Sequence, residues 1–193
     1  VANNTTQNAA NEYLEGDGYV AFDLFVMNLS GDAYYKENNE SNEEGLSKHI
    51  RDYLDDLDKD IIDYAIANKK PLLGICRGIQ AISATQGKKL YQDIPSSGLN
   101  HPHEDKYHDV VKVNNAPLAS RLPDKFRVNT FHHQCVKELP DGFVATYKNG
   151  DVIEAMEHLT LPIFGFQWHP ERLNDEQTEI IFSYFKECVA KTK

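Results

Sequence analysis

Residues 71–80 read PLLGICRGIQ, an apolar run that passes through a Gly-x-Cys-x-Gly pattern into a segment with helical spacing. We expect a short buried strand over Leu72–Ile75, a tight turn at Cys76 and a helix ending at Gly87. A strand that turns sharply into a helix is typical of a nucleophile elbow, where flanking glycines avoid a clash with the strained backbone of the nucleophile. The alternative is a buried thiol in an ordinary turn, and this motif alone does not decide between the two.

The segments before this stretch predict an α/β domain. Residues 49–69 keep their apolar side chains close to helical spacing, with Asp and Lys on the other face, so we expect an amphipathic helix there. Residues 19–27, YVAFDLFVM, are a strand candidate, and the acidic residues 36–47 resemble a loop. This order of strand, helix, strand and helix predicts an open, largely parallel sheet flanked by helices.

The second half of the chain predicts strands in direct succession. Four segments have strand character, and they read HDVVKVN, FRVNTFH, FVATYKNGDVIEAMEH and PIFGFQW. Within the third, Asn149-Gly150 is a hairpin signal. The last stretch, NDEQTEIIFSYFKECVAKTK, predicts a closing helix capped by Asn174 or Asp175. We therefore expect a single domain over residues 1–193 with an antiparallel section in its second half.

The composition limits which partners and which cellular location we expect for this domain. A chain of 193 residues with 40% hydrophobic content can bury a sizeable core, and a net charge of −10 argues against nucleic acid or an anionic membrane as partner. The sequence contains no run of 18 apolar residues, so it predicts no membrane-spanning helix. The polar N-terminal residues lack the pattern of a signal peptide. The three cysteines form no CxxC pair, so we expect a cytoplasmic protein. The oligomeric state stays open, a homodimer included.

A second motif supplies what a reactive cysteine would need. A thiolate in acyl transfer requires a base, and the base requires an orienting partner. The stretch GFQWHPE, residues 165–171, offers His169 and Glu171 at the end of a predicted strand, where residues two apart share a face. A surface histidine beside an acidic residue is the alternative. The presence of both motifs, in the order Cys, His, Glu, favours a triad.

The two motifs resemble the signatures of the class I glutamine amidotransferase-like superfamily. Within it, KKLYQDIP at residues 88–95 and VNTFHHQ at residues 128–134 are most similar to the γ-glutamyl-γ-aminobutyrate hydrolase branch, which is related to the folate γ-glutamyl hydrolases. The resemblance runs from about Tyr19 to the C-terminus. It implies a flavodoxin-like fold, a triad of Cys76, His169 and Glu171, and hydrolysis of a small γ-glutamyl substrate.

The oxyanion hole is expected from two places. The backbone N–H of Arg77, directly after the nucleophile, can point at an oxyanion. Family members complete the hole with a Gly-Gly-Gly-Asp turn; the matching residues 28–32 read NLSGD, so the resemblance implies Ser30 or Gly31 as the second donor. The family also has a strand, a helix and a strand before this turn. Residues 1–18 do not match them, so either the sheet lacks these strands or the chain is missing the segment.

Three further residues are implied for binding the glutamyl group. Gln80 lies one helical turn after Cys76. Phe131 and His132 belong to a segment that resembles the part of family members that binds the amino or carboxylate end of the glutamyl group. A solvated helix position is the alternative for Gln80. For His132, and for His133 beside it, the alternative is a structural or surface histidine.

Three histidines in the segment NHPHEDKYHD, at positions 101, 103 and 108, raise the question of a metal. The segment has too much loop character to predict a metal site, so we expect neither metal nor cofactor. Two other functions stay open. One is a glutaminase that hands ammonia to a synthetase partner, and the other is a non-catalytic binding protein built on this fold.

Overall fold

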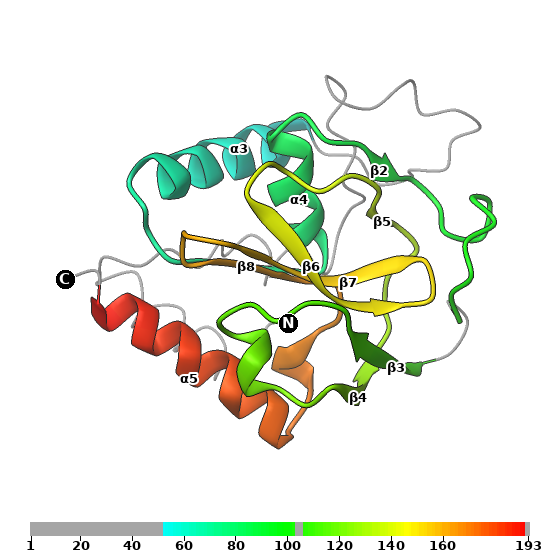
Figure 1. Ribbon diagram of the computed structural model, residues 1–193. Helices are drawn as coiled ribbons and strands as arrows, with labels where there is room; N and C mark the ends of the chain where they lie inside the picture. The colour runs from blue at the N-terminus through cyan, green and yellow to red at the C-terminus, as the bar shows by residue number, and fades with distance from the viewer. Residues whose placement is uncertain (1–51, 103–105, 192–193) are drawn as a thin grey trace.

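A curled six-stranded sheet with helices on both faces forms the part of the chain that the computed structural model describes, residues 52–102 and 106–191 (Figure 1). The strands follow in the order β1 (Leu72–Ile75), β8 (Ile163–Phe166), β7 (Val152–His158), β6 (Phe143–Asn149), β3 (Tyr107–Lys112) and β4 (Lys125–Asn129). A separate two-stranded sheet pairs β2 (Leu90–Tyr91) with β5 (Cys135–Val136). Two short 3-10 turns, η3 (Ala119–Arg121) and η4 (Pro170–Arg172), complete the described elements.

Strand direction divides the main sheet into two parts. Strands β1 and β8 run parallel, whereas every other neighbouring pair among the described strands is antiparallel. Strands β6 and β7 are joined through Gly150 and Asp151, and a connection this short can link only antiparallel strands. The α/β class and the antiparallel second half are thus confirmed. A largely parallel sheet is not what these six strands form, and the strand candidate at residues 19–27 lies outside the described residues.

The helices cover the two faces of the sheet. Helices α3 (Asp52–Ala67) and α4 (Arg77–Thr85) lie on one face, and α5 (Glu176–Lys191) lies on the other (Figure 1). All three match expected helices. The side chain of Asp175 accepts a hydrogen bond from the Thr178 N–H at 2.8 Å, which makes Asp175 the cap of α5. None of the helices in this described part combines the length and apolar composition needed to cross a bilayer.

The central strands β1 and β8 are buried on both faces. Leu72 and Ile163 pack under α3 and α4, while Leu73 and Phe164 face α5. This position explains why LLGI and IFGF are continuous apolar runs rather than alternating ones. Because the two strands are parallel neighbours, their carboxyl ends lie side by side, and the two sequence motifs follow directly from those ends.

Candidate active site

The backbone at Cys76 has the conformation expected of an elbow. Strand β1 ends at Ile75, helix α4 begins at Arg77, and Cys76 between them has φ 53° and ψ −104°. Within the described ranges, Lys69 is the one other non-glycine residue with positive φ. The Cys76 N–H donates to the Phe166 carbonyl at 2.7 Å, so the β1–β8 ladder extends up to the turn. Strain of this kind costs on the order of 1–3 kcal/mol and concentrates at functional sites.

Two paired glycines explain how α4 can start so close to the sheet. Gly74 of β1 and Gly165 of β8 are register partners. A Cβ on Gly74 would lie 2.8 Å from the backbone carbon and oxygen of Gly78, and one on Gly165 would lie 2.7 Å from Cγ1 of Ile79. The glycine before the cysteine is therefore required by helix–strand packing as well as by the turn.

The side chain of Arg77 anchors the elbow to α3. It forms buried ion pairs with Asp55 and Asp58, whose side chains also lie mostly out of solvent. The guanidinium is thus directed at α3. The Arg77 N–H is at the first position of α4, directly after the expected nucleophile. That placement suits the expected oxyanion donor, whereas Ser30 and Gly31 lie outside the described residues.

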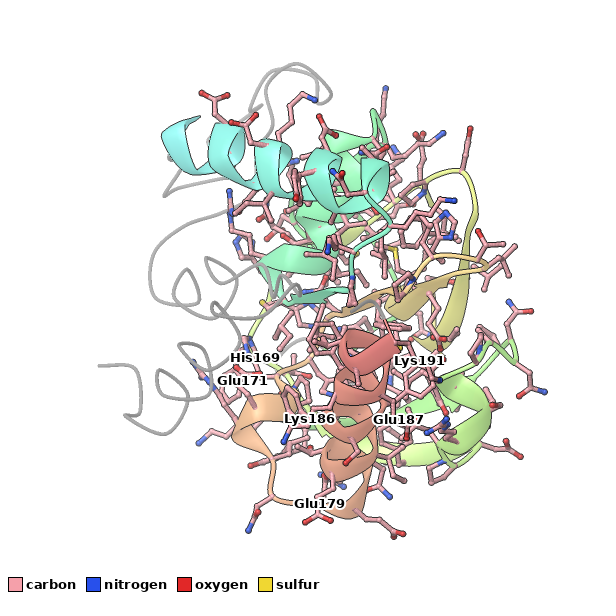
Figure 2. The ribbon with its side chains drawn as sticks, turned by 90° about the vertical axis from the view of Figure 1, so that its left-hand side faces the viewer. His169, Glu171, Glu179, Lys186, Glu187 and Lys191 are labelled. Atoms are coloured by element: carbon pink, nitrogen blue, oxygen red, sulfur yellow. The ribbon has the colours of Figure 1, made fainter. Side chains whose placement is uncertain are left out.

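His169 is held in place from several directions. Its Nδ1 lies 2.8 Å from Oε1 of Glu171, on the segment that leads from β8 towards α5 (Figure 2). The side-chain amide of Asn129 donates to the His169 carbonyl and accepts from the His169 N–H, both at 2.8 Å. The Phe131 ring meets the imidazole edge-on at 5.7 Å between centroids. These contacts fix both the backbone and the ring of the expected base.

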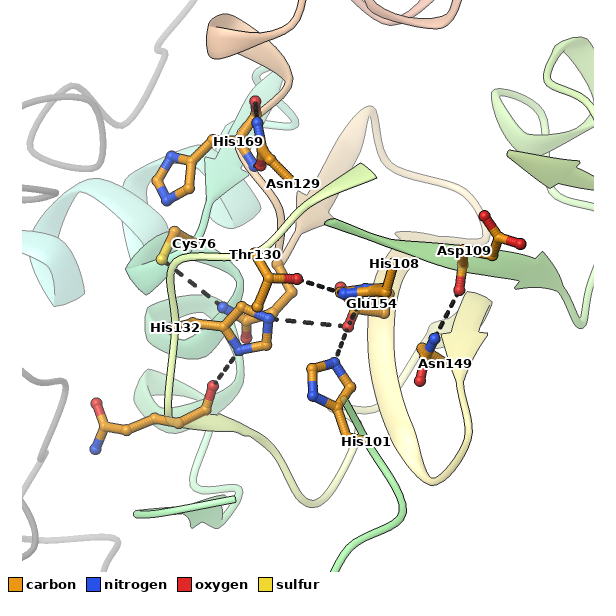
Figure 3. Close-up of polar contacts among 12 residues, drawn as sticks. Cys76, His101, His108, Asp109, Asn129, Thr130, His132, Asn149, Glu154 and His169 are labelled. Atoms are coloured by element: carbon orange, nitrogen blue, oxygen red, sulfur yellow. Dashed lines mark hydrogen bonds and ion pairs between the residues drawn. The ribbon is translucent and has the colours of Figure 1, made fainter. Parts of the chain in front are cut away.

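The electrostatics of His169 favour a charged ring. Burial lowers its pKa, but hydrogen bonds with the side chains of Cys76 and Glu171, together with their negative charge, raise the pKa to about 9. The ring lies over Cys76 in Figure 3. The structure therefore brings Cys76, His169 and Glu171 together, with a charged imidazolium favoured beside the sulfur of the expected nucleophile.

A chain of buried carboxamides leads to the thiol. Nε2 of Gln167 donates to Sγ of Cys76 at 3.8 Å, and Nε2 of Gln80 donates to Oε1 of Gln167 at 3.2 Å and to the carbonyl of Gln134 at 3.1 Å. Gln80 is thus buried rather than solvated. Sequence reasoning missed Gln167, although its position two residues before His169, on the same face of an extended segment, is a signal that could have identified it.

The segment after β4 sends consecutive side chains in different directions. Phe131 is 53% exposed beside His169, and the Arg172 guanidinium lies over its ring. His132 is buried and its Nδ1 lies 3.0 Å from the Gln134 carbonyl, whereas His133 faces Asp93. The expected contacts of Gln80, Phe131 and His132 with a substrate stay predictions.

The other two cysteines are in different environments from Cys76. Cys135 is fully buried, and burial together with the charge of Glu154 raises its pKa to about 12. Burial also raises the pKa of Cys188, which lies on the buried side of α5. Both therefore stay protonated thiols near neutral pH.

Comparison with known proteins assigns the family. Residues 28–171, more than half of the chain, match the Peptidase C26 family. The chain belongs to this family. The match includes both the elbow cysteine and the His169–Glu171 segment, which confirms the resemblance to the class I glutamine amidotransferase-like superfamily.

The curated relatives of this Peptidase C26 protein carry several names. The glutamine amidotransferase-like protein YvdE of Lactococcus lactis is 36% identical over 118 residues, which is 57% of this chain and 50% of that protein. A subunit of the glutamine-hydrolyzing GMP synthase of Methanocaldococcus jannaschii is 33% identical over 133 residues, 67% of this chain and 66% of that protein. The chain spans about half the length of relatives such as YvdE, at 50%, and protein NtpR of Enterococcus hirae, at 58%.

Solved structures agree on the fold. A Thermoplasma acidophilum protein assigned as a subunit of GMP synthase aligns with a TM-score of 0.59 at 25% identity, over 72% of this chain and 67% of that one. A Thermotoga maritima glutamine amidotransferase aligns with a TM-score of 0.55 at 18% identity, over 83% and 62%. The Peptidase C26 chain thus has the class I glutamine amidotransferase fold.

Proposed function

We propose that this protein is a cysteine-dependent hydrolase that cleaves the γ-glutamyl amide bond of small compounds such as γ-glutamyl-GABA, through a thioester intermediate. One observation carries the proposal: a strained, partly exposed cysteine lies beside a buried histidine whose pKa is raised to about 9 and whose Nδ1 is held by a carboxylate. The resemblance of the sequence to the γ-glutamyl-γ-aminobutyrate hydrolase branch supports the choice of substrate.

The proposed reaction begins with attack by sulfur. The Cys76 thiolate adds to the γ-carbonyl carbon, and the electron pair of the C=O bond moves to the oxygen, which the Arg77 N–H stabilises. Because Nδ1 of His169 is engaged by Glu171, its Nε2 is the atom that carries the proton. The oxyanion then collapses, the C–N bond breaks, and His169 protonates the leaving amine to give the thioester.

Hydrolysis of the thioester completes the cycle. His169, now neutral, takes a proton from a water that attacks the thioester carbonyl. Collapse of the second oxyanion breaks the C–S bond, releases glutamate and restores the thiolate beside imidazolium. Glu171 keeps the ring oriented in both halves and stabilises its positive charge. The hydrogen bond from Gln167 to Sγ adds a donor that stabilises the thiolate as leaving group.

A second function has its own support. The relatives named as subunits of a glutamine-hydrolyzing GMP synthase favour a glutaminase that supplies ammonia to a partner. The chemistry at Cys76 would be the same, with ammonia as the leaving amine. The two functions differ in substrate range, because an ammonia supplier acts on free glutamine and depends on its synthetase.

The test compares two substrates with the purified protein alone. We expect release of GABA from γ-glutamyl-GABA at a kcat/KM well above that for release of ammonia from glutamine. Cys76→Ser should abolish both reactions. Glutamine hydrolysis that exceeds γ-glutamyl-GABA hydrolysis would favour the ammonia supplier, and turnover of neither substrate by folded protein would contradict the proposal.

A further inference from the structure

Apart from the Cys76–His169 pair, three histidines converge on one carboxylate. The Nε2 atoms of His101, His108 and His132 lie 2.8, 3.0 and 3.8 Å from the same oxygen, Oε1 of Glu154 (Figure 3). The four residues come from separate parts of the chain, since Glu154 belongs to β7, His108 to β3, and the other two to loops. None of these groups takes part in the bond-making steps of the proposed reaction, although His132 is also an expected substrate contact.

This cluster is sealed from solvent. The four side chains are between 0% and 2% exposed. Within residues 52–102 and 106–191, histidines supply all the ion-pair partners of Glu154. Burying an ionised carboxylate costs free energy unless a cation lies beside it. The cation beside Glu154 can be a protonated histidine or a bound metal ion.

The contacts that Nδ1 makes in His132 and His108 bear on which form of the ring Nε2 turns towards Glu154. Nδ1 of His132 lies 3.0 Å from the carbonyl of Gln134, and a carbonyl only accepts hydrogen bonds, so Nδ1 carries the hydrogen. In the neutral ring, Nε2 then offers a lone pair towards Glu154, which is also an acceptor. Nδ1 of His108 contacts the hydroxyl of Thr130, which can donate or accept a hydrogen bond, so this contact allows the same form of the ring without fixing it. Metal-bound histidines characteristically use the second nitrogen in this manner.

We propose that His101, His108, His132 and Glu154 form a binding site for a divalent transition-metal ion of the Zn²⁺ type. Tetrahedral zinc with ligand bonds of about 2.0–2.1 Å places neighbouring ligand atoms about 3.3 Å apart. The three Nε2 atoms lie 2.8, 3.0 and 3.8 Å from Oε1, and the ligand atoms of His101, His108 and Glu154 all lie within 4.8 Å of one another, so the side chains would have to close in on a bound ion. Imidazole and carboxylate donors suit Zn²⁺, and four protein ligands make a closed, structural site rather than a catalytic one.

The expectation of no metal rested on residues 101, 103 and 108 alone. The fold adds Glu154 and His132 to two of those histidines, from positions that no local spacing connects. His103 lies outside the described residues. The loop character expected for the segment 100–109 therefore does not argue against a site whose remaining ligands come from β7 and from the turn after β4.

The position of the site connects it to the candidate active site. His132 belongs to the segment 129–134, from which Asn129 holds the backbone of His169 and Phe131 contacts its ring. An ion that fixes His132 restrains this segment. Bound metal is therefore expected to stabilise the fold, independently of which amide the protein hydrolyses.

The test uses full-length protein carrying Cys76→Ser, so that sulfur at the elbow cannot bind the added ion. Titration with Co²⁺ should give the visible absorption of a tetrahedral nitrogen and oxygen site, saturating at one equivalent. Zn²⁺ should displace the Co²⁺ and raise Tm by about 5 °C or more when saturating. Glu154→Gln and His132→Asn should each weaken binding by at least about tenfold. The matched control is His133→Asn, a change at the adjacent histidine that faces Asp93, and it should bind as tightly as its parent.

Either of two results would contradict the proposed metal site. One is the absence of Co²⁺ absorption and of any Zn²⁺-induced shift in Tm, which would mean that a proton compensates Glu154. The other is equal binding by Glu154→Gln and His133→Asn proteins. If a cluster variant does not fold, X-ray absorption of the Zn²⁺-loaded Cys76→Ser protein decides, because the site predicts imidazole scattering with no sulfur ligand.

Discussion

The strain at Cys76 should be measurable as a difference in stability between two variants. Cys76→Ala keeps a Cβ in a backbone with φ 53° and ψ −104°, whereas Cys76→Gly removes it. Relief of the strain is worth roughly 1–3 kcal/mol, and the greater freedom of glycine in the unfolded chain takes back about 0.4–1 kcal/mol. We therefore expect the glycine variant to be more stable than the alanine variant by about 1 kcal/mol.

The assay is urea unfolding of both variants, followed by circular dichroism, with melting temperatures as a second readout. A difference of about 1 kcal/mol corresponds to roughly 2–4 °C in Tm for a domain of this size. Lys186, exposed in the middle of α5, supplies the control. At that ordinary helical position the order should reverse, because glycine is less favourable than alanine by about 1 kcal/mol. A Cys76→Gly protein no more stable than Cys76→Ala would refute the assignment of a strained elbow.

Three further predictions concern the groups around the elbow. The His169 ring, followed by NMR, should titrate near pH 9, and Glu171→Gln should bring its pKa towards the ordinary value of 6.5. Because the folded pKa is raised, the charged ring stabilises the fold fully below about pH 6.5, and that stabilisation is lost as the pH rises through about 9. Arg77→Met should lower the free energy of unfolding by about 3–5 kcal/mol, since it leaves Asp55 and Asp58 buried without their guanidinium partner. Gly74→Ala should cost about 1–3 kcal/mol and lower kcat, because its Cβ would meet the backbone of Gly78 at 2.8 Å and displace the start of α4.

Each of these predictions has an outcome that would contradict it. A His169 pKa that Glu171→Gln leaves unchanged would remove the carboxylate from the account of the charged ring. For Arg77 the control is Arg121→Met, which breaks a solvent-exposed pair with Glu187 and should have a much smaller effect; equal losses would argue against a buried anchor. A Gly74→Ala protein with unchanged stability and kcat would show that the helix is not pressed against the strand.

The elbow and its partner histidine could be predicted because their signals are local. Cys76 sits in a five-residue Gly-x-Cys-x-Gly pattern, and His169 and Glu171 are two residues apart on an extended segment. The helix over residues 52–67 and the cap at Asp175 were likewise predictable from spacing and capping chemistry. In each case the residues that determine the structure are neighbours in sequence.

The remainder of the site depends on contacts between distant residues. The partners of Arg77 lie on α3, and Glu154 meets histidines that approach from β3 and from two loops. Sequence periodicity does not indicate contacts between residues that are far apart in the chain. The prediction of no metal therefore depended on the histidines of residues 100–109 alone. The antiparallel pairing of the second half was predicted from its succession of strands, whereas the expectation of a largely parallel sheet came from the order of the first elements, and β1 and β8 are the parallel pair among the described strands.

Labelling of the nucleophile tests the central claim most directly. The protein is incubated with an electrophilic glutamine analogue, a diazo ketone that alkylates a reactive thiol with loss of nitrogen, and the modified peptide is mapped by mass spectrometry. The account predicts one label, on Cys76 and not on Cys135 or Cys188, with loss of amidase activity in proportion to labelling and protection by excess γ-glutamyl-GABA. Full amidase activity in protein labelled completely at Cys76, or in Cys76→Ser protein, would contradict the claim that this sulfur attacks the amide.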